Sequence, residues 1–159
     1  MGGIFTLRLQ FFTRGARCRW DNAGLMSEKW CMMQIPHLLE GFDVDDAIAR
    51  MLGRPQLWWQ TLGYFVHEFA DWPQRWQASQ GDAEHERRVV HALRSAAANV
   101  GAQQLADAAR QLEQILLVGA IGVPGATTES RIHLLAAFSL CWESAAEAWT
   151  RSGATLPEG

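Results

Sequence analysis

A histidine flanked by arginines lies in the middle of the segment 83–100, and its surroundings suggest chemistry. At about 100° per residue, Val90, Leu93, Ala97 and Val100 share one face of a helix over this segment. His91 lies at the centre of the opposite, polar face. Its neighbours on that face, from one turn before it to two turns after it, are Arg87, Arg88, Arg94, Ser95 and Ala98. Because a histidine on a solvated face does not contribute to core packing, it is a candidate reactive group.

The arginines indicate what that chemistry would be. Like-charge repulsion from three guanidinium groups disfavours the imidazolium form, so we expect a ring nitrogen of His91 to be free as a nucleophile. The same guanidinium groups are partners for an anion. A phosphoryl group on the ring would carry roughly two negative charges, and arginine forms strong charge-assisted hydrogen bonds to such oxygens. The pattern is therefore typical of a covalent phosphohistidine carrier.

With these residues in view, the sequence resembles the histidine phosphotransfer (HPt) domains of multistep phosphorelays. The family motif is His-x-Leu-Lys-Gly, followed by small residues and a glycine that ends the helix. Here His91, Leu93, Arg94, Ser95 and Gly101 occupy those places, so arginine replaces the usual lysine and serine the usual glycine. The resemblance runs from about residue 41 to 118, less distinctly to 150, and includes the stretch Gly41-Phe42-Asp43, Gly53, Phe65 and the turn Gly81-Asp82.

The resemblance implies a function and its partners. His91 would accept a phosphoryl group from an aspartate on the receiver domain of a hybrid sensor kinase and pass it to an aspartate on a response regulator. Arg94 would be the charge partner of the phosphoryl group, and Ser95 would lie beside the site. Arg87 and Arg88 would steer the partner, and Ala98 would let it approach closely. Mg²⁺ would come from the receiver, so the chain would need no cofactor of its own and would be a phosphocarrier rather than a turnover enzyme.

Other functions remain open at this stage. A helical adaptor that docks a receiver or a kinase without accepting phosphate would explain Ser95 in the place of glycine. Without the motif, a surface histidine with no function would be the ordinary interpretation. A bundle enzyme or metal carrier is the weakest alternative. The remaining histidines lack the helical spacing with a carboxylate that a metal site in a bundle needs; they are His37, His67, His85 and His133.

Helical periodicity and caps predict the elements that position His91. Asp43 and Gly53 delimit a short helix over 44–52, and Asp82 and Gly101 delimit the helix over 83–100. Between them a helix from Pro55 to about 80 is kinked or broken by Pro73. A helix over 103–119 follows, and Thr127 or Thr128 caps a last helix that ends near 151. With no alternating strand pattern, we predict an all-α antiparallel up-and-down four-helix bundle with a short extra N-terminal helix.

Apolar stripes identify the expected core. Tryptophan and phenylalanine residues follow a helical stripe from Trp58 to Trp76, and Leu105, Ala108 and Leu112 do so in the helix over 103–119. Trp59, 100° from Trp58, could instead belong to a partner surface, as could Trp20 and Trp30. For the last helix the expected buried stripe consists of Ile132, Leu135, Ser139, Trp142, Ala145 and Trp149.

Composition places these elements in one domain. The chain has 159 residues, 48% of them apolar, and a formal net charge of −3, which does not favour nucleic acid as a partner. Residues 1–25 form a basic extension, for which disorder and a short docked helix or strand both remain open. Residues 26–42 form a lead-in, 43–151 the bundle and 152–159 a tail. No apolar run is long enough to span a membrane, and the odd number of cysteines (Cys18, Cys31, Cys141) favours free thiols in the cytoplasm.

Overall fold

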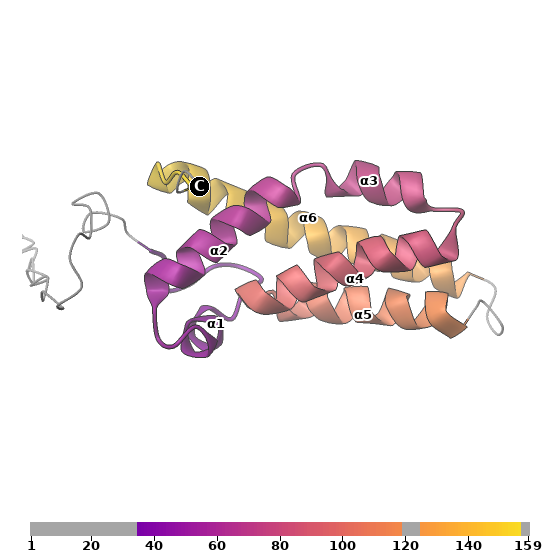
Figure 1. Ribbon diagram of the computed structural model, residues 1–159, viewed down its shortest axis with the longest axis horizontal. Coiled ribbons are helices and arrows are strands. Elements are labelled where there is room, and N and C mark those ends of the chain that lie inside the picture. The colour runs from indigo at the N-terminus through magenta and orange to yellow at the C-terminus, as the bar shows by residue number, and fades with distance from the viewer. Residues whose placement is uncertain (1–34, 119–124, 157–159) are drawn as a thin grey trace, which may run out of the picture. The chain divides into compact units, whose positions relative to one another are not determined.

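The computed structural model describes residues 35–118 and 125–156, and this part of the chain is all-helical (Figure 1). The predicted all-α class is confirmed: six helices and no strand occur in these residues. Predictions for 1–34, including the basic extension, Trp20, Trp30, Cys18 and Cys31, lie outside the described residues. The helices are α1 (Val44–Arg50), α2 (Pro55–Glu68), α3 (Trp72–Ser79), α4 (Ala83–Val100), α5 (Gln103–Val118) and α6 (Ala126–Ser152).

The helix ends show which local signals the sequence carries. The Asp43 carboxylate accepts a hydrogen bond from the Asp46 amide, and that of Asp82 accepts from the amides of Glu84 and His85, so both predicted caps are confirmed. The predicted cap of the last helix is wrong. α6 begins at Ala126, directly after Gly125, whose backbone adopts a left-handed conformation with φ +97°. Thr127 and Thr128 therefore lie inside the first turn rather than before it.

Pro73 breaks the helix that precedes α4. α2 ends at Glu68 and α3 begins at Trp72, because a proline ring clashes with the carbonyl group four residues earlier and has no N–H to donate. The Glu68 carbonyl accepts a hydrogen bond from Arg75 Nη2 at 2.6 Å. The core stripe nevertheless continues across the break, since Trp72 and Trp76 are both buried and stack with ring centroids 4.9 Å apart.

The helices pack around one apolar core. α4 packs on α5, α5 on α6 and α6 on α2, while α2 and α3 both pack on α4. The short helix α1 lies at the end where α4 and α5 are joined, against α2 and α4. The predicted inner face of α4 is confirmed: the buried residues include Val90, Leu93, Ala97 and Val100.

The predicted buried stripe of α6 is correct at Ala145 and Trp149, but the rest of the buried face differs from the prediction. Its buried residues are Leu134, Phe138, Cys141, Ala145 and Trp149. Ile132 is 67% exposed and Leu135 is 42% exposed. α6 carries apolar residues on two faces, so periodicity alone does not identify the inner one; the large rings of Phe138 and Trp149 fill the space between the helices. Burial also raises the pKa of the Cys141 thiol to about 11.

Trp59 belongs to this core, so its interpretation as part of a partner surface is wrong. Its ring is fully buried, with its centroid 5.8 Å from that of Trp58 and 5.3 Å from that of Trp149. α6 packs on the side of α2 that carries Trp59, a side that the sequence analysis did not assign to the core. Gly63 permits this approach, because a Cβ atom there would lie 2.3 Å from the Trp149 ring.

The turn between α4 and α5 is fixed by contacts from α1 and α2. Gly101 ends α4 with φ +89°, as predicted, and its carbonyl accepts a hydrogen bond from the Asp43 amide at 2.9 Å. Trp58 Nε1 donates to the Val100 carbonyl at 3.0 Å. A Cβ atom at residue 101 would lie 2.6 Å from the Asp43 carbonyl oxygen. Both backbone conformation and space therefore require glycine.

Gly53 offers a matched comparison for Gly101, because it also has a positive φ, +67°, but no atom near an added Cβ. We expect Gly53→Ala to lower the free energy of unfolding by about 1 to 2 kcal/mol, the cost of the left-handed conformation. Gly101→Ala should cost about 1 to 3 kcal/mol more, because the turn must also move away from Asp43. Urea unfolding measures both values, and equal losses would contradict the steric constraint.

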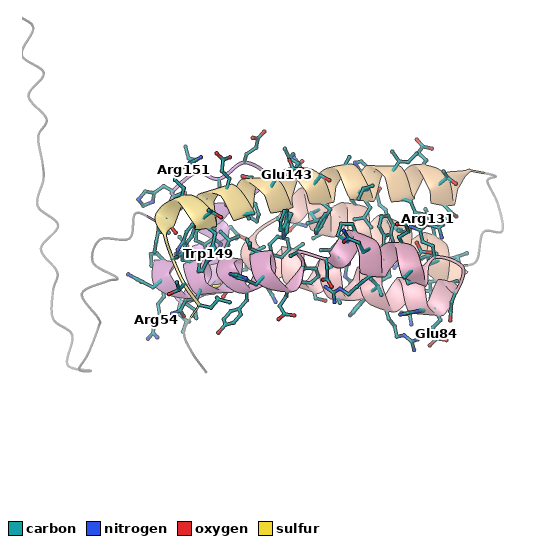
Figure 2. All side chains as sticks on the ribbon, turned by 90° about the horizontal axis from the view of Figure 1, so that it is seen from above. Arg54, Glu84, Arg131, Glu143, Trp149 and Arg151 are labelled. Atoms are coloured by element: carbon teal, nitrogen blue, oxygen red, sulfur yellow. The ribbon has the colours of Figure 1, made fainter. Side chains whose placement is uncertain are left out.

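A buried ion pair, which the sequence analysis missed, joins α3, α4 and α6. Glu86 is fully buried on α4, and its Oε1 accepts hydrogen bonds from Arg131 Nε at 2.8 Å and Trp76 Nε1 at 3.1 Å. Arg131 Nη2 pairs with Oε2, so the guanidinium group binds both carboxylate oxygens (Arg131 in Figure 2). These hydrogen bonds raise the pKa of Arg131. A buried charge is tolerated here because each carboxylate oxygen has a donor.

Glu86→Gln should therefore be strongly destabilising. Because the Arg131 side chain keeps 29% exposure, we expect a loss of about 3 kcal/mol, the lower end of the range for breaking a buried pair. Glu84→Gln, on the same helix, removes the exposed pair with Arg88 and should cost less than about 1 kcal/mol. The measurement is the free energy of unfolding in urea; a similar small loss in both variants would show that the buried pair adds nothing.

Candidate functional site

The geometry of the α4–α5 hairpin determines which residue of α5 lies next to His91. Two residues, Gly101 and Ala102, separate the helices, so α4 and α5 run antiparallel. His91 lies nine residues before the end of α4, and Glu113 lies ten residues after the start of α5. At a rise of about 1.5 Å per residue, both are roughly 14 to 15 Å from the turn. The hairpin therefore brings the two side chains to the same level.

His91 and Glu113 form a direct polar contact across the hairpin. Nδ1 of His91 lies 2.8 Å from Oε1 of Glu113. The imidazole side chain is 51% exposed, whereas the carboxylate is only 9% exposed. His91 thus contacts a nearly buried acid at one edge of its ring while much of the ring remains accessible to solvent.

Two arginines complete this group. Arg94 Nη1 lies 2.8 Å from Glu113 Oε2, and Arg87 Nη1 lies 4.0 Å from Oε1. The Arg94 contact is an ion pair without aligned hydrogen-bond geometry. Both guanidinium groups are partly exposed, so they cover the carboxylate from the solvent side. We call Glu113, His91, Arg94 and Arg87 the Glu113 cluster.

The structure places the remaining predicted residues outside the Glu113 cluster. Arg88 pairs with Glu84 at 3.4 Å on the exposed side of α4. The Ser95 hydroxyl is exposed and donates to the His91 backbone carbonyl at 3.0 Å. The carbonyl of half-buried Ala98 accepts a hydrogen bond from Arg50 of α1. The proposed roles of Arg88, Ser95 and Ala98 stay predictions.

The sequence analysis identified the arginines near His91 but missed the acid on α5 that contacts it, Glu113. The sequence nevertheless carried a signal for it. Glu113 follows Leu112 on the apolar face of α5, where a charged residue is unusual unless it has a partner. Antiparallel pairing about the turn at Gly101 would then have identified His91 as that partner.

A groove runs beside this region, between α4 and the pair α2 and α3. Its volume is about 730 Å³. Phe69, Trp72, Val89 and Ala92 provide apolar lining, and Arg75 and Arg88 also line it. Ala92 directly follows His91 in α4. A partner that enters the groove would therefore lie close to the histidine.

Fold and site together define a helical-bundle domain that presents a histidine beside arginines on one helix face. A family model described as Hpt domain matches residues 60–147, which is more than half of the chain. The chain belongs to this family. Domains of this kind are histidine phosphotransfer modules of phosphorelays that interact with receiver domains, and they are phosphocarriers rather than turnover enzymes. No curated protein and no solved structure matches the chain.

The matched range lies within the expected one. The sequence motifs predicted a resemblance from about 41 to 118, less distinctly to 150, and the match begins within α2 at residue 60 and extends through most of α6 to residue 147. Two further observations hold for the described parts of the chain. They contain no helix long and apolar enough to cross a membrane, and no cluster of three or more histidine, cysteine or acidic side chains placed to hold a metal ion.

Proposed function

We propose that His91 carries the phosphoryl group in a phosphorelay. It accepts the group from an aspartyl phosphate on the receiver domain of a hybrid sensor kinase and transfers it to an aspartate on a response regulator. The observation that supports this most strongly is a half-exposed imidazole in an Hpt domain with two arginines in the same cluster. A nucleophile that must meet two different proteins has to be accessible, and His91 is.

Arg94 is the proposed charge partner of the phosphoryl group. Its guanidinium group lies one turn from His91, is partly exposed, and pairs with Glu113 without an aligned hydrogen bond. A small rotation of its long side chain would let it bind phosphoryl oxygens in the complex. Phosphoryl transfer needs alignment and charge neutralisation more than covalent help from the protein. Mg²⁺ and the acidic pocket belong to the receiver in this proposal, so this chain supplies only the nucleophile and the arginine.

The groove beside α4 is the proposed docking surface for the receiver. Its apolar lining suits the apolar side chains of a partner helix, and Arg88 can attract acidic side chains around them. Transient signalling interfaces are often small, so weak binding agrees with the proposal. In it, Arg87 lies beside Glu113 on the α5 side of the phosphoryl site, and Ala98 leaves space for the partner farther along α4.

The finer architecture is also part of the proposal. α2 and α3 act as one interrupted helix, which with α4, α5 and α6 makes an antiparallel up-and-down four-helix bundle, and α1 is the extra N-terminal helix. The continuous core stripe from Trp58 to Trp76 supports this view. A cytoplasmic location fits the odd number of cysteines, of which Cys141 is a buried free thiol.

His91→Gln should abolish labelling by a phosphorylated receiver. The free energy of unfolding should change little, because the side chain is half-exposed and glutamine can still donate to Glu113. Radiolabel transfer and thermal unfolding measure the two effects, and His133→Gln on the exposed side of α6 is the control. If the glutamine variant is still labelled, a residue other than His91 carries the phosphoryl group. If the unmodified protein accepts no label from a panel of active receivers, the adaptor hypothesis is favoured.

Arg94→Ala should slow phosphoryl transfer by about 10-fold to 100-fold, since a charge-assisted contact of roughly 1.5 to 3 kcal/mol is lost. Arg94→Lys keeps the charge and should have a much smaller effect. Arg151→Ala, which removes an exposed arginine at the far end of α6, is the control (Figure 2). Rapid-quench kinetics with a phosphorylated receiver give the rates; equal rates for alanine and the unmodified protein would exclude Arg94 from the transfer step.

A further inference from the structure

We propose that Arg75 of α3 is a positioning residue for the docking of the receiver. It holds the break between α2 and α3 in one geometry, and this geometry sets the shape of the groove in which the receiver docks. The inference rests on the proposed function, because it concerns the docking step of the same reaction. It gives a role in partner recognition to a residue outside both the sequence motif and the Glu113 cluster.

The first step concerns the backbone at the break. The last carbonyl groups of a helix have no donor within that helix. In an unbroken helix the Glu68 carbonyl would accept a hydrogen bond from the amide of Trp72. Here that amide donates to the Phe69 carbonyl at 3.2 Å, and Arg75 Nη2 donates to the Glu68 carbonyl at 2.6 Å. Arg75 therefore replaces a hydrogen bond that the break removes.

A second contact of Arg75 is with the turn between the two helices. Its Nε lies 3.0 Å from Oδ1 of Asp71, the residue directly before α3. One guanidinium group thus joins the end of α2 to the start of α3, and its planar fork fixes the direction of both contacts. The Arg75 and Asp71 side chains are 51% and 69% exposed, so their ion pair adds little to the free energy of unfolding. The consequence of the pair is geometric: it restrains the turn.

The break lies in the wall of the groove. Lining residues come from both sides of it, with Glu68 and Phe69 before the turn and Trp72, Arg75 and Ala78 after it. Trp72 Nε1 donates to the Val89 carbonyl at 3.4 Å, so α3 is held against α4. A change at the turn would therefore move Phe69 relative to the α3–α4 pair. Because the centre of an interface packs as closely as a protein interior, such a change of shape weakens docking.

The groove and the Glu113 cluster involve different neighbours of α4. The groove is formed with α2 and α3, whereas His91 contacts Glu113 of α5. Arg75 contacts Asp71 and the Glu68 carbonyl and does not belong to the charged groups around the histidine. Its loss should therefore raise the concentration of receiver needed for transfer and leave the maximal rate unchanged.

Three substitutions separate a positioning role from a direct charge contact with the partner. Arg75→Ala removes both contacts at the break. Arg75→Lys keeps the positive charge in the groove, but an ammonium group lacks the fork that joins Asp71 and Glu68. Asp71→Ala removes one of the two contacts that hold the guanidinium group, and Asp71 itself does not line the groove.

The control is Glu147→Ala, which removes an exposed ion pair with Arg151 at the far end of α6 (Figure 2). The probe is the phosphorylated receiver that labels His91 in the radiolabel assay. Rapid-quench transfer over a range of receiver concentrations gives the half-saturating concentration and the maximal rate. Circular dichroism checks that each variant is folded.

We expect the half-saturating concentration to rise about 5-fold to 10-fold in Arg75→Ala and in Asp71→Ala, with the maximal rate within about 2-fold of the unmodified protein. Arg75→Lys should recover only part of the loss, and the control should show none. An unchanged half-saturating concentration in Arg75→Ala would overturn the proposal. Full recovery in Arg75→Lys, or no effect of Asp71→Ala, would overturn it as well, since Arg75 would then act through its charge alone.

The same experiment distinguishes this inference from the proposed function. If the unmodified protein is labelled and the Arg75 and Asp71 variants behave like it, the inference fails while the phosphorelay function stands. If no receiver of the panel labels the unmodified protein, the proposed function fails, and the role of Arg75 in docking fails with it.

Discussion

Gly101 joins α4 to α5 in a left-handed conformation, and the Asp43 backbone packs against it too closely for any side chain. This contact sets the register of the two helices, because the start of α5 can take only one position once the end of α4 is held by Asp43 and Trp58. The register in turn brings Glu113 to the level of His91. A local backbone constraint at the end of the bundle therefore determines the composition of a site roughly 15 Å away.

Two nearly buried carboxylates on the same hairpin have different consequences because their partners differ in exposure. Glu86 is enclosed by Arg131 and Trp76, with donors on both oxygens, so its pairing stabilises one arrangement of α3, α4 and α6. Glu113 is paired with groups that reach solvent, and one of its oxygens has no aligned donor. An incompletely satisfied charge beside an accessible imidazole is suited to chemistry rather than to structural support.

The bundle also explains why so little catalytic equipment is needed. A phosphocarrier must be specific for its partners and must leave its nucleophile accessible, and most of the chemistry of the transfer can reside in the receiver. In this chain the inner face of α4 packs on an apolar core of tryptophan, phenylalanine and leucine side chains. The outer side of α4 keeps the histidine half-exposed, and the groove beside it gives a partner an apolar surface within reach of His91.

The sequence alone determined the features that depend on neighbouring residues: the caps at Asp43 and Asp82, the stop at Gly101 and the inner face of α4. Backbone hydrogen bonding and amphipathic spacing act over one or two turns, so local sequence carries them. The HPt resemblance, which rested on the residues around His91, is confirmed by the family match. Tertiary structure decided which face of α6 is buried, the burial of Trp59, the Glu86–Arg131 pair and the position of Glu113 beside His91. Each depends on which helix, distant in the sequence, packs on a given surface. Local periodicity does not predict that packing partner.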